Sequence, residues 1–499
     1  MNSRDPKSRP RAIRMKPVAA AVATAVGSIP AVVLAQDAPT TMLEEIVVTA
    51  TRRAESVQDI PINISAFSGG QLEQQRIYNL RQFARYVPGL TVVDQGPRAA
   101  SPIIIRGLHV DDLTAAEAPF NSGGDTVATY FGEVPVYIDL DLVDIDRVEV
   151  LRGPQGTLFG ANSLGGAVRF LPKKPDTEAF SVEAHGRFYS IDDADDLSYQ
   201  ADLMVNAPFA DNWAFRGVVS YRDQAGWIDQ PFLIPQSDVG FVNPEDPASF
   251  APQEDTNDWQ RTTFRGSLLW DITENGSAQL TYNYQKDEIG GRQVNHTDHC
   301  TAVVNGTLPN PPVAGSGAPL FPAGCSPSDF ETVNANRVLE ANERENQIIE
   351  LDIIWDFGFA ELTSATGFTS FEETGQRDQT DLLLNFEYTY GTYPAFTAFT
   401  SEVEETDRIT QEFRLVSQTD GIVDWIGGFF YRDEDFSQTS REFTPGYIGG
   451  PTSFLGITGP VDSSGNPIFV EYLQFPDDEF KEWAIFGEIG SNFTTDRFN

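Results

Sequence analysis

Basic residues, histidine, cysteine and long apolar runs are all scarce in this chain of 499 residues. Lys and Arg number 34 against 73 Asp and Glu, and the net charge of −39 makes nucleic acid a poor partner. Residues 18–34 form the one apolar run of membrane-like character, which excludes a bundle of transmembrane helices. Apolar residues make up 40% and aromatic residues 11%, which excludes wholesale disorder. A large soluble β or α/β protein and a β-barrel membrane protein both remain open.

The N-terminus has the composition of a secretory signal peptide. Residues 1–16 carry six cations and one anion, and small apolar residues follow over 18–34. A basic region, an apolar region and a cleavage site of small residues define such a signal. The alternative is a membrane anchor, but Gly27, Pro30 and the short apolar length argue against it. We therefore predict that residues 1–35 are a signal peptide.

Four histidines and two cysteines offer few groups for catalysis or metal binding. Because no Ser-His pair and no metal-ligand spacing occurs in a strand context, we predict a protein that is not an enzyme and holds no metal and no cofactor. The string from His296 to Cys300 resembles a metal cluster, but a polar loop beside a disulfide explains it better. Cys300 and Cys325 would form that disulfide in an oxidising compartment, stabilising the loop by roughly 3 kcal/mol.

From residue 181 onward, ten segments alternate between apolar and polar residues with a period of two. In residues 277–285, for example, Ala278, Leu280 and Tyr282 share one face. Most of the segments are about 9–13 residues long, which is the length that a tilted strand needs to cross a bilayer. The predicted strands are 181–190, 198–206, 213–222, 261–271, 277–285, 349–355, 361–372, 406–417, 422–434 and 481–490.

The connections between these segments alternate between short and long. The short ones are residues 207–212, 272–276, 357–360 and 419–421, and two of them contain the hairpin dipeptides Asn-Gly and Asp-Gly. The long ones are 224–260, 288–346, 373–405 and 435–480. Short turns on the periplasmic side and long extracellular loops are typical of outer-membrane barrels.

The tryptophans are sorted in the same way. Four fall near the short-turn ends of their strands and three near the long-loop ends, as two aromatic girdles at the membrane surfaces require. A soluble β-sandwich would also alternate, but it would need neither sorted tryptophans nor unequal loops. The first group is Trp213, Trp270, Trp355 and Trp425, and the second is Trp227, Trp259 and Trp483.

Residues 44–172 lack this regularity and mix helix and strand signals. Asn79 is a plausible N-cap for a helix that Pro88-Gly89 ends. Residues 103–105, 134–138 and 147–151 are predicted as short strands. A glycine-rich run follows over 152–166, but no Lys-Ser/Thr follows its second glycine, so we reject a phosphate-binding loop and predict tight turns in a crowded space.

These motifs resemble those of the TonB-dependent outer-membrane receptors. Residues 44–51 look like a TonB box, residues 148–160 are close to the signature of the plug domain, and residues 408–432 are similar to a recurrent barrel hairpin. The resemblance implies that partner binding falls to Glu45, Ile46, Val47, Val48, Thr49 and Ala50. The residues that match plug motifs are Arg106, Gly107, Glu149, Arg152, Gly153, Pro154, Gly156, Gly160, Gly165 and Gly166.

The resemblance implies a mainly β chain, with an N-terminal α/β plug followed by an antiparallel transmembrane β-barrel. The expected boundaries are a signal peptide over 1–35, a periplasmic segment with the TonB box over 36–54, a plug over 55–172 and barrel strands over 180–499. The partners expected are TonB, outer-membrane lipid and a small-molecule or iron-chelate ligand, without an obligate oligomer. The location expected is the bacterial outer membrane.

The function implied is TonB-dependent import of a scarce ligand, by default a ferric siderophore. Oligosaccharide, cobalamin or haem are the alternatives within the family, and a passive porin or a secreted enzyme are alternatives of another class. The β-branched segment 46–49 can add as a strand to a partner sheet and could hang free in the periplasm. Arg106, Glu149 and Arg152 could pair either with the barrel or within the plug.

Ligand contacts are expected on the extracellular side. Aromatic side chains there can stack on aryl iron chelates or sugars, although they could equally pack on one another. The candidates are His109, Asp111, Asp112 and Phe120 in the plug and Tyr388, Tyr390, Tyr393 and Tyr447 in the barrel loops.

Ten strands cannot enclose a domain of the 129 residues over 44–172. Such a domain is roughly 36 Å across, and barrels that hold plugs have about 22 strands. We therefore expect that the chain is truncated about halfway around a barrel. Because an open sheet edge is not viable in lipid, we do not expect this fragment to function alone.

Overall fold

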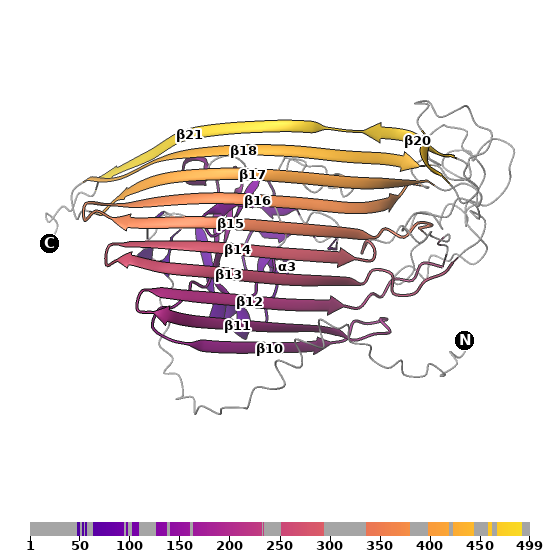
Figure 1. Ribbon diagram of the computed structural model, residues 1–499, viewed down its shortest axis with the longest axis horizontal. Coiled ribbons are helices and arrows are strands. Elements are labelled where there is room, and N and C mark those ends of the chain that lie inside the picture. Colours follow the sequence, from indigo (N-terminus) through magenta and orange to yellow (C-terminus); the bar gives the residue numbers. More distant parts are fainter. Residues whose placement is uncertain are drawn as a thin grey trace.

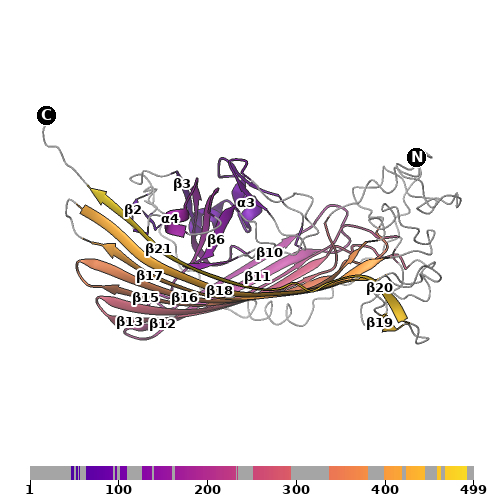
Figure 2. The ribbon, with the colours of Figure 1, turned by 90° about the horizontal axis from the view of Figure 1, so that it is seen from above.

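The structure, a computed structural model, consists of a long curved sheet and a smaller α/β unit in its concave side (Figures 1 and 2). We call the sheet the wall and the unit the plug. Among the described residues, no helix is long and apolar enough to cross a membrane. The described residues are 47–49, 52–53, 55–56, 63–93, 96–97, 102–108, 126–136, 140–159, 163–231, 233, 251–293, 336–379, 398–418, 423–443, 458–461 and 467–491.

The wall is antiparallel, and its long strands follow one another in chain order. The strand β18 pairs with β21 along one part of its length and with the short β20 along another, and β19 pairs with β20. The strands are β10 (Ser181–Tyr189), β11 (Ser198–Ala210), β12 (Trp213–Gln224), β13 (Trp259–Thr273), β14 (Gly276–Ile289), β15 (Asn342–Asp356), β16 (Ala360–Asp378), β17 (Phe399–Ser417), β18 (Val423–Phe443), β19 (Thr458–Val461), β20 (Pro467–Gln474) and β21 (Asp477–Ser491).

All ten predicted strands exist in the predicted order, and short connections join β11 to β12, β13 to β14 and β15 to β16 as predicted. The predicted turn at 419–421 lies outside the described residues. All but β10 are longer than predicted, and β16 and β17 have 19 residues each and β18 has 21. In β16 to β18 most of the extra length lies at the long-loop ends, where polar outward residues such as Glu405 and Asp435 continue the ladder. The prediction was too short there because it followed apolar alternation, which stops before the hydrogen bonding does. For the same reason the sequence did not reveal β19 and β20.

The two faces of the wall have opposite polarity. Leu280, Ile409 and Phe413 point outward and are 36% or more exposed, whereas their neighbours Thr281 and Thr410 point inward and are buried. An apolar outer face and a polar inner face are the reverse of a soluble sheet and suit a wall that faces lipid. Apolar alternation therefore predicted correctly which side chains face outward.

One predicted girdle residue is wrong. Trp213 and Trp270 are register partners near the short-turn end and stack with ring centroids 5.1 Å apart, as a girdle requires. Trp259, in contrast, is 8% exposed and points inward, with the guanidinium groups of Arg222 and Arg261 over its ring. Its position at a strand end fitted a girdle, but its register places it on the polar inner face.

The plug contains a five-stranded sheet in the order β3-β8-β9-β6-β7, in which only β6 and β9 are parallel. Separate from it are two small two-stranded sheets, β1-β2 and β4-β5. The elements are β1 (Val47–Val48), β2 (Glu55–Ser56), β3 (Ile64–Ser68), α2 (Gly69–Gln74), α3 (Leu80–Ala84), β4 (Leu90–Val92), β5 (Ile103–Ile105), β6 (Val127–Phe131), β7 (Val134–Pro135), β8 (Ile145–Arg152), α4 (Gly156–Phe159) and β9 (Gly166–Pro172).

Local sequence explains several plug elements. Asn79 caps α3, as predicted, because its side chain accepts a hydrogen bond from the amide of Gln82. Ser68 caps α2 through a capping box with Gln71, which the sequence reading missed. In the glycine-rich run, Gly166 has a φ of +151°, and a Cβ there would lie 2.1 Å from the carbonyl oxygen of Leu151. This turn therefore accepts only glycine.

The plug and the wall share packing. The apolar core of the plug includes Phe83, Val148 and Phe170, and Ile348 of β15 packs into the same cluster from the wall. Two glycines allow a still closer approach, as described below. The plug is thus seated directly on the inner face of the wall.

Candidate functional site

The segment that contains the predicted TonB box is folded against the plug. Val47 and Val48 form β1, which pairs with Ser56 and Glu55 of β2. The side chain of Val48 is completely buried, whereas Val47 is 48% exposed. The described part of the box is therefore docked, and our expectation that it hangs free is wrong for these residues.

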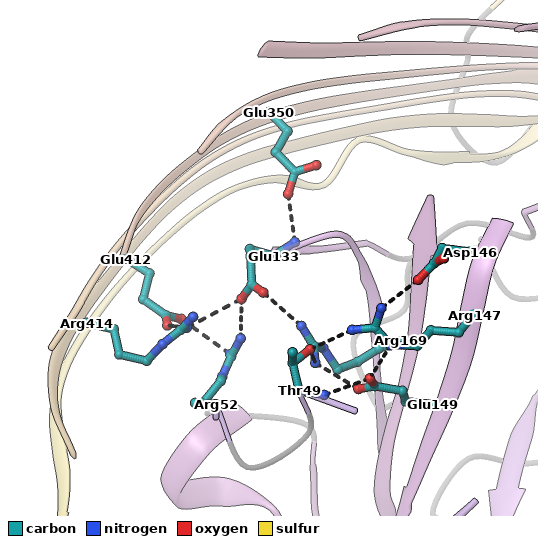
Figure 3. Close-up of polar contacts among 10 residues, drawn as sticks. All are labelled: Thr49, Arg52, Glu133, Asp146, Arg147, Glu149, Arg169, Glu350, Glu412 and Arg414. Carbon is teal, nitrogen blue, oxygen red and sulfur yellow. Dashed lines mark hydrogen bonds and ion pairs between the residues drawn. The ribbon is translucent and has the colours of Figure 1, made fainter. Parts of the chain in front are cut away.

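Thr49 fastens this segment to the centre of the plug (Figure 3). Its backbone amide donates a 2.9 Å hydrogen bond to the carboxylate of Glu149 on β8. Its hydroxyl accepts hydrogen bonds from Arg147 at 3.1 Å and from Arg169 at 2.9 Å. Because β8 and β9 are inner strands of the plug sheet, the box is tied to the most enclosed part of the domain.

Arg169 connects the box to two buried acids. Its guanidinium group lies 2.8 Å from Glu149 and 2.8 Å from Glu133, and the side chains of Arg169 and Glu149 are both fully buried. Such pairs are stable only when their remaining donors and acceptors find partners. Thr49 supplies two of these partners, because its amide donates to Glu149 and its hydroxyl accepts from Arg169. The docked segment is therefore part of the charge network.

Arg52 extends the network from the docked segment to the wall. Its fully buried side chain pairs with Glu133 of the plug and lies 3.6 Å from Glu412 of β17. The guanidinium carbon lies 4.3 Å from the ring centroid of Phe159, within the range of a cation–π contact. One arginine of the N-terminal segment therefore contacts the plug and the wall at once.

Glu133 is the point at which the plug meets the wall (Figure 3). Its carboxylate lies 3.4 Å from Arg414 of β17, which also pairs with Glu412. Its backbone amide donates a 2.7 Å hydrogen bond to the carboxylate of Glu350 on β15. The tip between β6 and β7 is thus held by side chains from two wall strands.

Two glycines make this approach possible. Gly132 has a φ of +59°, and a Cβ there would lie 2.3 Å from a carboxylate oxygen of Glu350. On the wall, a Cβ at Gly367 would lie 2.6 Å from both methyl groups of Val134. A side chain at either position would force its neighbour, Glu350 or Val134, to shift.

Electrostatics stabilise the charged forms of the network. Burial alone would raise the pKa of Glu133, but the nearby guanidinium groups, led by Arg52 and Arg169, hold it well below the usual range. Burial would likewise lower the pKa of Arg52, and Glu412 and Glu133 raise it instead. Both groups are therefore charged at neutral pH.

A second contact between plug and wall lies on β12 and β13. Asp144 accepts a 2.7 Å hydrogen bond from Arg216, and Asp141 lies 3.0 Å from Arg222 and 3.1 Å from Arg261. The plug is thus attached through acids at two places, the tip and the loop after β7. Sequence reasoning named none of these acids.

The residues of the plug signature make their described contacts inside the plug. Glu149 pairs with Arg147 and Arg169, and Arg152 donates to the carbonyl of Pro88 and to Ser65. Arg106 lies beside the turn that holds Gly153. Of the two alternatives left open by the sequence, these contacts therefore fit pairing within the plug.

The remaining signature positions are backbone turns or lie outside the described residues. Gly107 and Gly153 have positive φ, Gly156 begins α4 with Pro154 just before it, and Gly165 and Gly166 precede and begin β9. Outside the described residues lie Glu45, Ile46, Ala50, Gly160, His109, Asp111, Asp112, Phe120, Tyr388, Tyr390, Tyr393, Tyr447, Cys300 and Cys325, together with the predicted signal peptide.

The residues that sequence reasoning missed are those that join the segments. A signal was present for some of them, because Glu133 and Arg169 are single charges among apolar residues, and Glu412 and Arg414 belong to the barrel hairpin motif at 408–432. Within the described ranges, no group of three or more His, Cys, Asp and Glu side chains has the geometry to hold a metal ion. The missed residues are Arg52, Glu133, Asp141, Asp144, Arg169, Glu350, Glu412 and Arg414.

Known proteins share this arrangement. The family model of the TonB-dependent receptor plug domain matches residues 56–167. The iron-regulated outer membrane virulence protein of Vibrio cholerae is 28% identical over 199 residues, which are 38% of this chain and 29% of that protein. The plug therefore belongs to the plug domains of TonB-dependent receptors. The ferripyoverdine receptor of Pseudomonas aeruginosa is also 28% identical, over 37% of this chain and 21% of that receptor.

Solved TonB-dependent receptors have the same fold. The ferripyoverdine receptor of Pseudomonas aeruginosa superposes with a TM-score of 0.58 at 15% identity, covering 88% of this chain and 51% of that one. The ferric yersiniabactin uptake receptor of Yersinia pestis gives 0.54 at 12% identity, covering 86% and 61%. The chain thus spans 51% and 61% of the length of these structures, and its sequence matches span 29% and 21% of the two curated relatives.

Proposed function

We propose that this protein, as part of a closed barrel, imports a scarce extracellular ligand across the bacterial outer membrane by a process that TonB drives. The observation that carries the proposal is the docked box segment, which is joined by buried charges to the plug and to the wall at once. A passive pore has no use for such a connection. A force on this segment would act directly on the contact that seats the plug.

Few backbone contacts hold the box segment to the plug. The strand β1 is held to β2 by two register pairs, and Val47 is exposed. A partner strand can therefore replace β2, since main-chain hydrogen bonds supply the affinity in this mode of recognition. The exchange leaves the number of strand hydrogen bonds nearly unchanged, so its cost falls mainly on the side chains of Thr49 and Arg52.

When the segment departs, Arg52 leaves with it, which weakens the contact between plug and wall without leaving an unpaired acid. Glu133 keeps Arg169 and Arg414, and Glu412 keeps Arg414. The network therefore tolerates departure of the segment while losing one of the groups that bridge plug and wall, so that the tip keeps only its contacts with Arg414 and Glu350. We infer that the tip at Glu133 then separates from the wall and opens a path for the ligand.

A ferric siderophore is the ligand class that we favour. Relatives include proteins named as receptors for ferripyoverdine and ferrioxamine, and others are named as vitamin B12 transporters. Ligand contact by the plug residues His109, Asp111, Asp112 and Phe120 and by the loop tyrosines remains a prediction. Cobalamin is the second candidate because several relatives carry that name.

The test is uptake in a host that lacks its own receptors for the compounds supplied. Radio-iron-labelled hydroxamate and catecholate chelates and labelled cobalamin are offered with and without a protonophore. The proposal predicts accumulation of one of these compounds that stops when the proton-motive force is collapsed, and its loss in Val47→Pro with binding at the cell surface retained. Accumulation that survives the protonophore would identify a passive pore and contradict the proposal.

A further inference from the structure

The inner face of the wall carries four arginines on two neighbouring strands. Arg216 and Arg222 lie on β12, and Arg261 and Arg265 lie on β13. All four are buried, with between 3% and 6% of their surface exposed. So dense a group of buried cations is unexpected in a chain with a net charge of −39 and needs a specific counter-charge.

The sheet itself brings like charges together. Arg222 and Arg261 are direct cross-strand partners, and like charges in this relation repel. Arg265 is the partner of Val218, which places it diagonally across from Arg216 on the same face. The four side chains therefore form two pairs, each with one arginine from either strand.

The wall supplies only part of the counter-charge. Asp287 of β14 pairs with Arg261, and Arg222 donates to the amide oxygen of Gln200. Glu183 lies 3.9 Å from Arg216, but its side chain is 39% exposed. The buried carboxylate of Asp202 on β11 also attracts Arg222. The wall thus pairs directly with one of the four arginines, and the rest depend mainly on another source.

That source is the loop of the plug after β7, in which each of two aspartates bridges one arginine pair. Asp141 lies 3.0 Å from Arg222 and 3.1 Å from Arg261. Asp144 accepts from Arg216 at 2.7 Å and lies 3.5 Å from Arg265. Both carboxylates belong to the plug and both arginine pairs to the wall, so the contact breaks whenever the plug leaves.

The fit of the aspartates is imperfect. Asp144 has a φ of +55°, a strained conformation for a residue other than glycine. Although Asp141 and Arg222 are within ion-pair distance, the Oδ2 atom of one and the Nη2 atom of the other have no aligned hydrogen bond. The guanidinium carbons of Arg222 and Arg261 lie 5.3 and 5.2 Å from the ring centroid of Trp259. Two guanidinium groups above an aromatic ring suit a planar oxygen anion.

We propose that the two arginine pairs are anion-binding sites on the import path, occupied at rest by Asp141 and Asp144 and taken over by the anionic oxygens of the ligand once the plug moves. The inference rests on the proposed function and adds the chemistry of the ligand: an anionic chelate with carboxylate, catecholate or hydroxamate oxygens. Replacement of one carboxylate by another keeps the buried arginines compensated. Asp141 and Asp144 also prevent other anions from binding to the wall while the plug is in place.

The first experiment measures anion binding with sulfate and citrate as the probes. Purified wild type, Asp141→Asn, Asp144→Asn and the control Glu183→Gln are melted in chloride or in either probe at equal ionic strength. We expect the probes to raise the melting temperature of each Asp→Asn variant by at least about 3 °C, against less than about 1 °C for wild type and the control, because only the variants vacate a site.

Further variants test whether the response to the probes comes from the arginine pairs. In Asp141→Asn combined with Arg222→Gln the response to sulfate should be lost, because one arm of the site is gone. The two single Asp→Asn variants probe separate sites, so failure of one to fold still leaves the other. An equal response in Glu183→Gln, or no response in either Asp→Asn variant, would overturn the proposal.

The second experiment separates this inference from the proposed function. Arg222→Gln and Arg265→Gln should slow the energised uptake of an anionic iron chelate at least about fivefold, while surface affinity for the chelate stays within twofold of wild type. The control is Arg408→Gln, an inward arginine that pairs with Glu434 within the wall. Slowing by Arg408→Gln to the same degree would overturn the inference. Uptake by wild type that ignores a protonophore would instead contradict the proposed function.

Discussion

The backbone amide of Thr49 donates a 2.9 Å hydrogen bond to the buried carboxylate of Glu149. Thr49 belongs to the predicted TonB box and Glu149 to the plug signature, two motifs that the sequence gives no reason to place together. Their contact joins the segment that a partner would grip to the centre of the domain that closes the barrel. The predictions below concern this connection.

Loss of Glu149 should release the box segment. In Glu149→Ala, Arg169 keeps Glu133 but loses its fully buried partner, and breaking such a pair costs about 3–5 kcal/mol. Trypsin cleavage after Arg52 or Arg53, slow in wild type because Arg52 is buried, should accelerate at least about tenfold. In Glu149→Gln, which keeps an acceptor for Thr49, cleavage should be intermediate. Equal cleavage in all three proteins would show that Glu149 does not hold the segment.

Arg52 should oppose binding of the energising partner. Arg52→Ala removes the bridge to Glu133 and Glu412, so the isolated periplasmic domain of TonB should bind several-fold more tightly in a calorimetric titration. Arg52→Lys keeps the charge but not the planar group over Phe159, and it should have a smaller effect. Arg53→Ala is the control, because Arg53 is partly exposed and pairs with Asp424 instead. An affinity that changes equally in all three variants would contradict this role.

Gly132 should tolerate no side chain. Gly132→Ala combines a φ of +59° with a clash against Glu350, and we expect a loss of about 1–3 kcal/mol of stability. The control is Gly107→Ala, since Gly107 has a similar φ of +76° but no atom within 4 Å of the added Cβ. A double-mutant cycle with Glu350→Ala, followed by thermal unfolding, should show strong non-additivity. Additive losses would mean that the tip does not press on Glu350.

The docked segment should loosen in acid. A depressed pKa in the folded state means that Glu133 stabilises the fold above its ordinary value of 4.5 and loses that contribution as the pH falls below it. Arg52 remains charged throughout, so the loss comes from the acid. Hydrogen exchange of residues 47–49, corrected for the intrinsic effect of pH, should rise below about pH 4.5 in wild type. The rise should be absent in Glu133→Gln, where the segment is already loose, and an unchanged rise there would assign it to another group.

Sequence periodicity predicted most of the wall, because its strands alternate against lipid on one side and water or plug on the other. Where this contrast ends, at the polar outer parts of β16 to β18, the prediction stopped too early. It also placed Trp259 on the wrong face, since a strand end does not reveal on which side the residue lies. The buried strands β6 and β9 do not alternate, so they were missed.

The candidate site was only half predictable. Motifs identified Thr49 and Glu149, which lie in conspicuous local patterns. Glu133, Glu350 and Arg414 come from three distant segments, and each is an ordinary charge until the chain folds. Long-range partners of this kind are set by the seating of the plug on the wall, which a single sequence does not encode locally.

The central claim is that uptake requires the tip of the plug to leave the wall. Val134 and Gly367 touch across this boundary, so Val134→Cys with Gly367→Cys should form a disulfide that ties plug to wall. We predict that the oxidised double variant binds its ligand at the cell surface but does not import it, that reduction restores import, and that the Val134→Cys single variant imports in either redox state. Import at the wild-type rate through a fully cross-linked protein would contradict the account.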